Sequence, residues 1–260
     1  MGKAVLLIDG DSVAFKAACA NQQSTDWGDG VSVDVDHKGA EAHMASALAS
    51  YQDALNVDRM IVCLGGGDNW RKKLWPAYKA NRKDKERPIL LPHCYQHLTD
   101  NYEVEAWPRL EADDVMGILA TTIKDSIIVS VDKDMRSVPC RLYNPGKPEE
   151  GIVWVDEVMA HEWHMKQTLM GDTADGYSGV PGIGPKKAEK IVRTVFENVD
   201  PIRNYSAWRI ELWKAVVNSF VSSELTPEDA LMQARMAYIL RHPHEYNRKT
   251  SKLKLWRPPT

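Results

Sequence analysis

The sequence of 260 residues contains only four cysteines, and no two of them form a CxxC pair. It therefore predicts neither a cysteine zinc site nor a disulfide framework, and it is typical of a protein from a reducing cytoplasm. No apolar run approaches the roughly 18 residues of a membrane-spanning helix, so no membrane contact is expected. The apolar stretch near the amino terminus is short and ends at carboxylates, unlike a signal peptide. A GxxxxGK[ST] loop is absent, which argues against hydrolysis of nucleoside triphosphates.

A large charge of one sign is also missing, because 33 Lys and Arg face 36 Asp and Glu and leave a net charge of −3. On its face this argues against a protein coated in positive charge for binding nucleic acid. The charge is unevenly distributed, however. Residues 71–87 carry +6 and residues 241–260 carry +5, so the remainder of the chain carries −14. Near-neutrality is therefore a cancellation between basic segments and an acidic remainder.

Continuous apolar runs predict strands that are buried on both faces, as in a parallel sheet. These runs cover residues 4–8, 60–64, 102–107 and 126–131. Helical patterns lie between them, at 38–55, 89–100 and 111–123. This alternation predicts a doubly wound, mostly parallel α/β domain over residues 1–156.

The pattern changes from about residue 157 onward. Helices are expected at 157–170, 185–197, 206–222 and 227–241. Pro185 and Pro227 fall in the first turn of two of them, where a missing N–H is tolerated. We therefore expect a second, helical domain over residues 157–260.

Acidic side chains follow three of the predicted strands directly. They are Asp9 and Asp11, then Glu111, Asp113 and Asp114, then Asp132 and Asp134. Ligands of open α/β sheets bind at the carboxyl ends of the strands, so these clusters are expected to meet. Carboxylates held together repel one another unless cations join them, and an all-oxygen set favours Mg²⁺ or Mn²⁺ over zinc. The alternative is that each acid is only a helix N-cap.

A glycine-rich turn joins the helices at 157–170 and 185–197. Its sequence, GVPGIGPKKA, starts at Gly179 and includes Gly182, Gly184, Lys186 and Lys187. Exposed backbone N–H groups and lysines at the start of a helix form a phosphate site, so this helix–hairpin–helix pattern predicts contact with a DNA backbone. The alternative is a plain helix–helix connection with glycine caps. Asp172 and Asp175 lie just before this turn.

Residues 71–87 combine cations with aromatic rings. The candidate nucleic-acid contacts in this segment are Arg71, Lys72, Tyr78, Lys79, Arg82 and Lys83. Cations beside flat rings suit a passage for single-stranded nucleic acid. The alternative is an ordinary solvated surface.

Together, the motifs IDGD, YKANR, ExDD, VDKD and GDxxDGYSGVPGIGPKKA resemble the flap-endonuclease and 5′→3′ exonuclease family. The DGYSG variant and the closing ARMAYILR…LWRP resemble the small stand-alone exonucleases of T-seven-like phages. This resemblance covers nearly the whole chain. It implies a PIN/resolvase-like nuclease domain followed by a helical DNA-clamping domain, and a location in the cytoplasm, that of the bacterial host if the gene belongs to a phage.

The resemblance also implies a phosphodiesterase with two metal ions, Mg²⁺ or Mn²⁺ in its place, that acts on DNA from 5′ ends. By motif, the first ion would be held by Asp9, Glu111, Asp113 and Asp114, and the second by Asp132, Asp134, Asp172 and Asp175. Lys79 and Arg82 would contact the phosphate at the reaction centre. The partners expected are duplex 5′ ends and flaps, with RNA–DNA hybrids as an extension, and a monomer is the default.

The sequence departs from the family at one position. The family carries an Asp just beyond the second strand, where Gly66 stands here. Asp68 is the candidate that would reach the same ion from a shifted position. The departure keeps a catalytically impaired DNA-binding protein open as an alternative. An RNA-directed PIN-like nuclease is the other alternative, but such proteins are shorter and lack the glycine hairpin.

Overall fold

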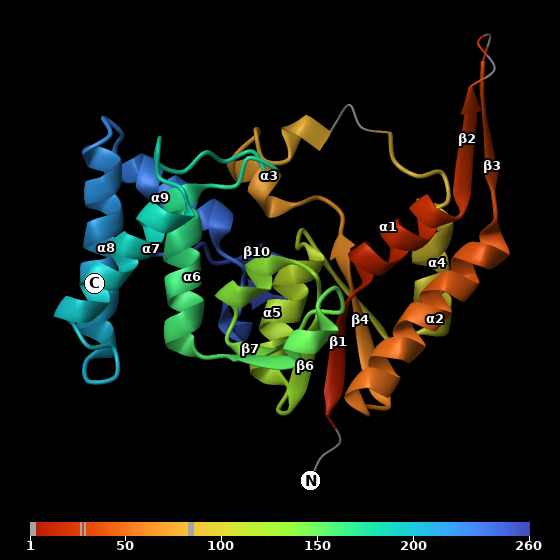
Figure 1. Ribbon diagram of the computed structural model, residues 1–260, viewed down its shortest axis with the longest axis horizontal. Coiled ribbons are helices and arrows are strands. Elements are labelled where there is room, and N and C mark those ends of the chain that lie inside the picture. The colour runs from red at the N-terminus through yellow and green to blue at the C-terminus, as the bar shows by residue number, and fades with distance from the viewer. Residues whose placement is uncertain (1–3, 27, 29, 83–85) are drawn as a thin grey trace.

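The computed structural model describes residues 4–26, 28, 30–82 and 86–260. At its centre lies a six-stranded sheet with the strand order β5-β4-β1-β6-β7-β8 (Figure 1). The strands are β1 (Val5–Asp9), β4 (Arg59–Gly66), β5 (Val104–Pro108), β6 (Ser126–Val129), β7 (Cys140–Tyr143) and β8 (Ile152–Val155). All neighbours in this sheet are parallel except β7 and β8. The expected doubly wound, mostly parallel sheet is confirmed, and β7 and β8 extend it beyond the four predicted strands.

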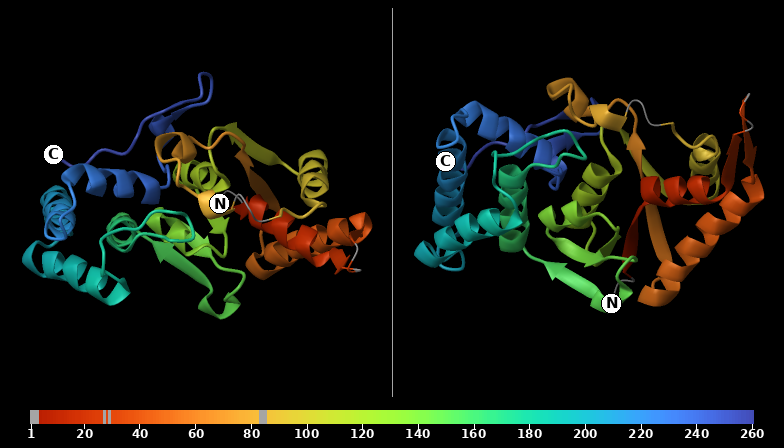
Figure 2. Two further views of the ribbon diagram at one scale, coloured as in Figure 1. Left: turned by 90° about the horizontal axis from the view of Figure 1, so that it is seen from above. Right: turned by 45° about the horizontal axis from the view of Figure 1, so that its top comes forward.

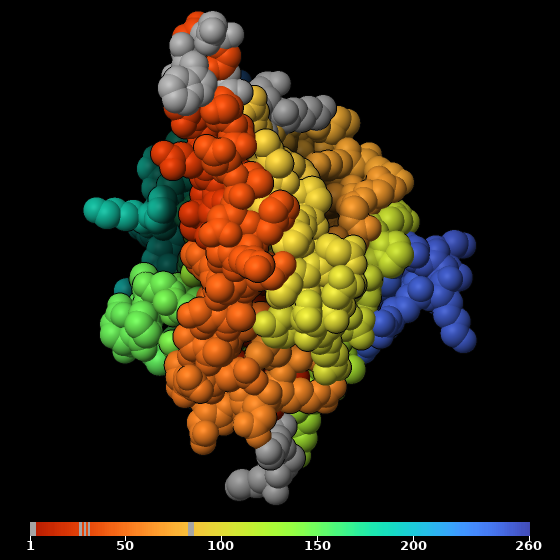
Figure 3. All heavy atoms as spheres, turned by 90° about the vertical axis from the view of Figure 1, so that its right-hand side faces the viewer, coloured from red at the N-terminus to blue at the C-terminus, as the bar shows by residue number. Residues whose placement is uncertain are grey.

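The sheet is covered on both faces because its apolar strands alternate between two cores. Leu6 and Ile8 of β1 contribute to one core, and Val5 and Leu7 contribute to the other. Helices α1 (Gly10–Ala20), α2 (His37–Leu55) and α4 (Leu91–Asn101) cover the first face. Figure 3 shows α2 and α4 side by side on this outer surface. Helix α5 (Ala112–Thr122) covers the second face.

A two-stranded antiparallel hairpin projects from the first layer (Figure 1). It is formed by β2 (Gln22–Asp26) and β3 (Val31–Val35) between α1 and α2. Its strands carry many polar residues, so no continuous apolar run marked them in the sequence.

The carboxy-terminal part is built from four helices at one end of the molecule, opposite α2 and α4 (Figure 2). They are α6 (Glu157–Met170), α7 (Pro185–Asn198), α8 (Tyr205–Val221) and α9 (Pro227–Ala237). Short elements complete the chain: α3 (Trp70–Leu74), η1 (Ala80–Arg82), η2 (Lys133–Ser137), η3 (Pro148–Glu150), η4 (Pro243–Glu245), β9 (Tyr246–Asn247) and β10 (Lys252–Leu253). None of the helices in the described ranges is long and apolar enough to cross a membrane.

The last helix is shorter than predicted, since it ends at Ala237 and not at residue 241. Backbone groups just beyond its end bind elsewhere: the carbonyl of Tyr238 accepts from Arg71, and the N–H of Leu240 donates to Asp114. These groups are therefore not available to extend the helix. The sequence pattern alone could not reveal this competition.

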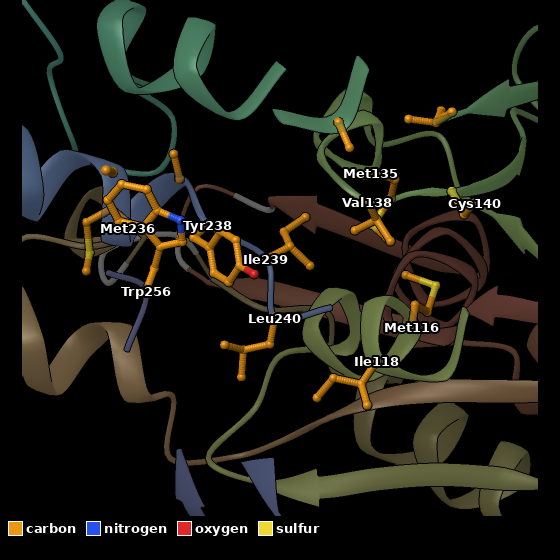
Figure 4. Close-up of a cluster of buried hydrophobic side chains, with 14 of the residues drawn as sticks. Met116, Ile118, Met135, Val138, Cys140, Met236, Tyr238, Ile239, Leu240 and Trp256 are labelled. Atoms are coloured by element: carbon orange, nitrogen blue, oxygen red, sulfur yellow. The ribbon is translucent and has the colours of Figure 1, made fainter. Parts of the chain in front are cut away.

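The helices beyond residue 157 share one apolar core with the second face of the sheet. Figure 4 shows part of this core, where Met116 and Ile118 of α5 lie near Ile239 and Leu240 from the carboxy-terminal segment. Gly117 makes this approach possible, because a Cβ there would lie 2.3 Å from the carbonyl oxygen of Leu240. A common core couples the stability of the two parts.

One residue of this core is a histidine without hydrogen-bond partners. His161 is 0% exposed, and neither of its ring nitrogens has a partner. Its ring packs edge-on against Trp208, with the ring centres 5.6 Å apart. Burial lowers the pKa of His161 well below its usual value of 6.5, and the positive charges of neighbouring groups lower it further.

We expect His161→Phe to reduce the sensitivity of the protein to acid. The unfolded chain takes up a proton at His161 below about pH 6.5 and the folded chain does not, so this residue lowers the free energy of unfolding as the pH falls. The gain of the variant over the wild type should grow by about 1.4 kcal/mol for each pH unit below about 6. Urea unfolding between pH 7.5 and 5 measures it. The control is the same change at the exposed His43. If the difference in free energy of unfolding between His161→Phe and the wild type stayed constant from pH 7.5 to 5, the expectation would be contradicted.

Candidate metal centre

The strand order brings the predicted carboxylates to one edge of the sheet. Asp9 ends β1, Glu111 and Asp113 follow β5, and Asp132 follows β6. Strands β5, β4, β1 and β6 are neighbours in this order and run parallel, so their carboxyl ends share an edge. The convergence that the sequence predicted is therefore present for these residues.

Asp9 and Asp132 are held by hydrogen bonds as well as by the backbone. Asp9 Oδ1 accepts from the Ser12 N–H at 3.0 Å, and its Oδ2 accepts from the Ser130 hydroxyl at 3.0 Å. Asp132 Oδ1 accepts from the Asp134 N–H at 2.7 Å. The N-cap alternative thus describes part of what these acids do. Capping fixes each carboxylate in place at the strand end and does not remove it from the centre.

Burial, followed by mutual repulsion, raises the pKa values of the carboxylates at this end of the sheet. Burial raises the pKa of Asp9, and it raises that of Asp113 much further, with the charge of Asp132 acting on both. Burial followed by the charge of Asp132 raises the pKa of Asp134 to about 7. A hard divalent cation such as Mg²⁺ binds oxygen donors, and its charge offsets the mutual repulsion of carboxylates. The donor atoms at this edge are therefore of the kind that such an ion prefers. Among the described residues, no group of three or more His, Cys, Asp or Glu side chains is already arranged to hold an ion.

The second group of acids comes from η2, which carries Asp134, and from the loop after α6, which carries Asp172 and Asp175. Arg82 Nη2 lies 2.6 Å from Asp175 Oδ1, and Lys133 Nζ lies 3.2 Å from Asp172 Oδ2. Asp134 binds the amide of Gln167 on α6. Each of these acids is therefore held by a cation or an amide donor.

Lys79 connects the two groups of acids. Its ammonium lies 2.6 Å from Glu111 Oε1 and 3.6 Å from Asp175 Oδ2. Burial by itself would raise the pKa of Glu111, but the charges of Arg71 and Lys79 outweigh it and bring the pKa down to about 2. Glu111 and Asp175, which the sequence assigned to different ions, thus face the same cation.

The segment that carries Lys79 is fixed against the loop that carries Asp175. The Lys79 N–H donates to the Asp175 carbonyl at 2.8 Å, and the Trp75 indole donates to the Gly176 carbonyl at 3.1 Å. Gly176 has φ +80°, and a Cβ there would lie 2.3 Å from the Ala77 carbonyl oxygen. Only glycine allows the two segments to approach so closely.

Two of the predicted site residues form a buried ion pair instead. Arg71 is 2% exposed and Asp114 is 0% exposed. Arg71 Nη1 and Nη2 each lie 2.8 Å from one oxygen of Asp114, whose oxygens also accept from the Trp70 indole and the Leu240 N–H. The prediction that Arg71 contacts DNA is wrong because the guanidinium is buried, and the prediction that Asp114 is a metal ligand is wrong because its oxygens are fully used.

Two further predictions need correction. Tyr78 is 3% exposed, with its hydroxyl 3.0 Å from Glu111 Oε2 and 3.1 Å from Asp175 Oδ2, so no ring face is left for stacking on a base. The Asp68 side chain is 64% exposed and pairs with Lys73 at 2.6 Å. The structure therefore gives Asp68 no place among the buried carboxylates. Lys83 lies outside the described residues.

The remaining predicted DNA contacts lie on the surface. Lys72 is exposed on α3, and the glycine turn exposes Gly182, Gly184, Lys186 and Lys187. Gly184 directly precedes Pro185, the first residue of α7, so the lysines lie in the first turn of that helix. Their contact with DNA stays a prediction.

Sequence reasoning missed two residues that hold the carboxylates. Ser130 donates to Asp9 and accepts from the Asp132 N–H at 3.1 Å, and Gln167 binds Asp134. The position of Ser130, directly after a buried strand and before the VDKD motif, was a usable signal. Gln167 lies in the last turn of α6, and nothing in the local sequence distinguishes it.

The neighbouring residues Asp113 and Asp114 should respond oppositely to the loss of charge. Asp114→Asn removes the bidentate partner of the buried Arg71, leaves it only the carboxylate of Glu111 at 2.7 Å, and should lower the free energy of unfolding by about 3 kcal/mol. Asp113→Asn removes a carboxylate that repels its neighbours, so this variant should raise the free energy of unfolding in EDTA by on the order of 1 kcal/mol. Urea unfolding in EDTA measures both. Equal losses of stability in the two variants would contradict the separate roles.

Stabilisation by Mn²⁺ should depend on pH, because the ion competes with protons for the carboxylates. With the pKa of Asp134 at about 7, lowering the pH from 8 to 6 protonates that side chain and weakens binding of the ion by about tenfold. The rise in melting temperature caused by Mn²⁺ should therefore be smaller at pH 6 than at pH 8. Thermal unfolding with and without the ion at each pH cancels the titrations of groups that do not bind the ion, and an equal rise at both values would contradict the expectation.

Comparison with known proteins agrees with this geometry. The family model described as "5'-3' exonuclease, N-terminal resolvase-like domain" matches residues 4–157. The exonuclease of Escherichia phage T7 is 29% identical and the exodeoxyribonuclease of Enterobacteria phage T3 is 28% identical, each over 98% of this chain and over 94% and 93% of their own lengths. The flap endonuclease Xni of Shewanella woodyi is 30% identical over 61% of this chain and 68% of its own.

Solved structures share the fold at low sequence identity. The T5 5'-exonuclease with bound zinc ions superimposes with a TM-score of 0.62 at 16% identity, covering 91% of this chain and 89% of that one. The catalytic core of Rad2 in complex with DNA superimposes with a TM-score of 0.54 at 13% identity, covering 99% and 83%. The ordered motifs, the mostly parallel sheet and the match of the family model together place this chain in the 5′–3′ exonuclease family.

Proposed function

We propose that this protein is a 5′→3′ exodeoxyribonuclease that needs Mg²⁺ and removes nucleotides from the 5′ ends of duplex DNA. Cutting of 5′ flaps and removal of RNA from RNA–DNA hybrids are extensions of the same activity. The observation that carries the proposal is the gathering of acids from three strand ends at one edge of the sheet, where the charges of Asp132, Asp9 and Glu111 act on Asp113. Lys79 joins this cluster to the loop after α6 through Glu111 and Asp175. We expect a monomer in the cytoplasm of the bacterial host, as for a phage replication or recombination enzyme.

Two divalent ions would be held at this edge of the sheet. The candidate ligands of the first are Asp9, Glu111 and Asp113, and those of the second are Asp132, Asp134, Asp172 and Asp175. When bound, such ions lower the pKa of an attacking water and stabilise charge on the phosphate and the leaving oxygen. Neighbour structures with metal ions, such as that of the T5 5'-exonuclease, support a metal requirement, and the all-oxygen donors support Mg²⁺.

Lys79 and Arg82 would bind the phosphate at the reaction centre. Both cations now pair with Glu111 or Asp175 and lie at the rim of the acidic cluster. Lys79 has φ +52°, an unusual backbone conformation held by its N–H bond to Asp175. Neutralisation of the acids by divalent ions would free both cations for the oxygens of the phosphate, where they stabilise negative charge in the transition state.

The helical part from residue 157 onward would hold the duplex away from the reaction centre. Backbone N–H groups at the start of α7, with Lys186 and Lys187 exposed there, suit the phosphates of one strand. Such contacts are independent of base sequence. Solved complexes of Rad2 and of the T5 D15 flap endonuclease contain DNA, which supports this class of substrate.

The function is tested on duplex DNA labelled at the 5′ end in one sample and at the 3′ end in another. The wild type with Mg²⁺ should release the 5′ label at once and shorten the 3′-labelled strand progressively. Lys79→Ala should lower kcat by about 100–1000-fold and Asp134→Asn by at least about 100-fold, with little change in DNA affinity. The exposed Asp100 on α4, changed to Asn, is the matched control for the loss of a carboxylate.

The same experiment separates the alternatives. Binding of DNA without release of nucleotide in Mg²⁺ or Mn²⁺ would show a catalytically impaired DNA-binding protein. Release from labelled RNA but not from DNA would show an RNA-directed nuclease. Either outcome would overturn the proposal.

A further inference from the structure

The row of acids along the sheet edge has a gap at β4. Going along the edge, β5 is followed by Glu111 and Asp113, β1 ends at Asp9, and β6 is followed by Asp132. Strand β4 lies between β5 and β1 and ends in Gly65 and Gly66, and the acid that follows it, Asp68, is 64% exposed and pairs with Lys73. One of the four strands at the centre therefore supplies no carboxylate of its own.

Gly66 cannot carry a side chain in this backbone. A Cβ at this position would lie 1.9 Å from the carbonyl oxygen of Trp107 on β5. That oxygen belongs to the paired neighbouring strand and cannot move without disturbing the sheet. The packing of β4 against β5 therefore excludes an acidic side chain at position 66.

Asp11 fills the space at the end of β4. Its Oδ1 accepts from the Gly65 N–H at 3.2 Å, and a Cβ on Gly65 would lie 3.0 Å from its Oδ2. The carboxylate therefore lies where a side chain of Gly65 would begin, on the face of β4 opposite to that of a Gly66 side chain, and it belongs to the first turn of α1. It is half-buried, and the charges of Asp9 and Glu111 both act on it.

We propose that Asp11 is a metal ligand of this centre and takes the place of the acid that β4 lacks. The inference rests on the metal-dependent function proposed above. Its basis is positional: Asp11 is anchored to the strand end that lies between Asp9 and Glu111. Asp68, the replacement suggested by sequence position, pairs with Lys73 in solvent.

The variant Asp11→Asn distinguishes a role of Asp11 as a metal ligand from a role as a hydrogen-bond acceptor only. The amide oxygen of Asn keeps the acceptor for the Gly65 N–H, while the charge that would bind an ion is lost. We expect Mn²⁺ to bind this variant about 10–100-fold more weakly than the wild type, measured by calorimetry without DNA. Asp68→Asn should bind Mn²⁺ as the wild type does. Unchanged affinity in Asp11→Asn, or a loss only in Asp68→Asn, would overturn the inference.

Direct coordination is tested by replacing the carboxylate with a thiol. Cd²⁺ prefers thiolate ligands, and a Cd–thiolate bond absorbs in the ultraviolet. Asp11→Cys should show this band after subtraction of the wild-type spectrum, and Asp68→Cys should not. Asp11→Asn could bind Mn²⁺ more weakly while Asp11→Cys shows no Cd–thiolate band. Asp11 would then act only as a nearby charge and not as a ligand, and the assignment would be overturned.

The outcomes for the function and for Asp11 are distinct. A wild type that binds no Mn²⁺ would overturn both the metal-dependent function and this inference. A wild type that binds Mn²⁺ with the same affinity as Asp11→Asn would overturn the inference and leave the proposed function standing.

Discussion

The ion pair between Arg71 and Asp114 connects the three parts of the chain that the site depends on. Arg71 follows β4, Asp114 lies in the first turn of α5, and both bind the backbone just after α9. Removing Arg71 would leave the charge of Asp114 in the core without its cation, which costs several kcal/mol, and removing Asp114 would leave Arg71 only Glu111 as a partner. The pair also sets the start of α5, and thereby the positions of Glu111 and Asp113 at the edge of the sheet. A buried contact with no catalytic role thus places the carboxylates that would have one.

The acids at the centre are held together against their own repulsion. Burial and neighbouring charges raise the pKa values of Asp9 and Asp113, so these side chains destabilise the metal-free fold in their ionised form. Backbone N–H groups and the Ser130 hydroxyl hold Asp9 in place regardless. Repulsion among the acids lowers the free energy of unfolding of the metal-free protein, and a bound ion would raise it again. Metal binding would therefore be measurable as an increase in the stability of the fold.

Much of the fold could be predicted because continuous apolar runs mark strands buried on both faces, and the acids after them mark the functional edge. The sequence could not separate Asp113 from Asp114. Adjacent residues on a helix point about 100° apart, and which one faces the core depends on where Arg71 lies. For the same reason Arg71 looked like a surface cation among its basic neighbours. The end of α9 was missed because its backbone groups bind a pair that is distant in sequence, and the β2–β3 hairpin because its strands bury little apolar surface.

Lys79 and Arg82 have carboxylate partners now and would have phosphate partners in the proposed reaction. Their present bonds to Glu111 and Asp175 partly offset the repulsion among the acids, which is the task that divalent ions would take over. With the carboxylates neutralised by bound ions, Lys79 and Arg82 would be free to bind the phosphate of the substrate. The close contact of Gly176 with Ala77 keeps the segment of Lys79 in place during this exchange, because the backbone bonds at Lys79 and Trp75 do not involve either carboxylate. In the proposed reaction, ion binding and phosphate binding would therefore be coupled through charge, without a need to move the backbone.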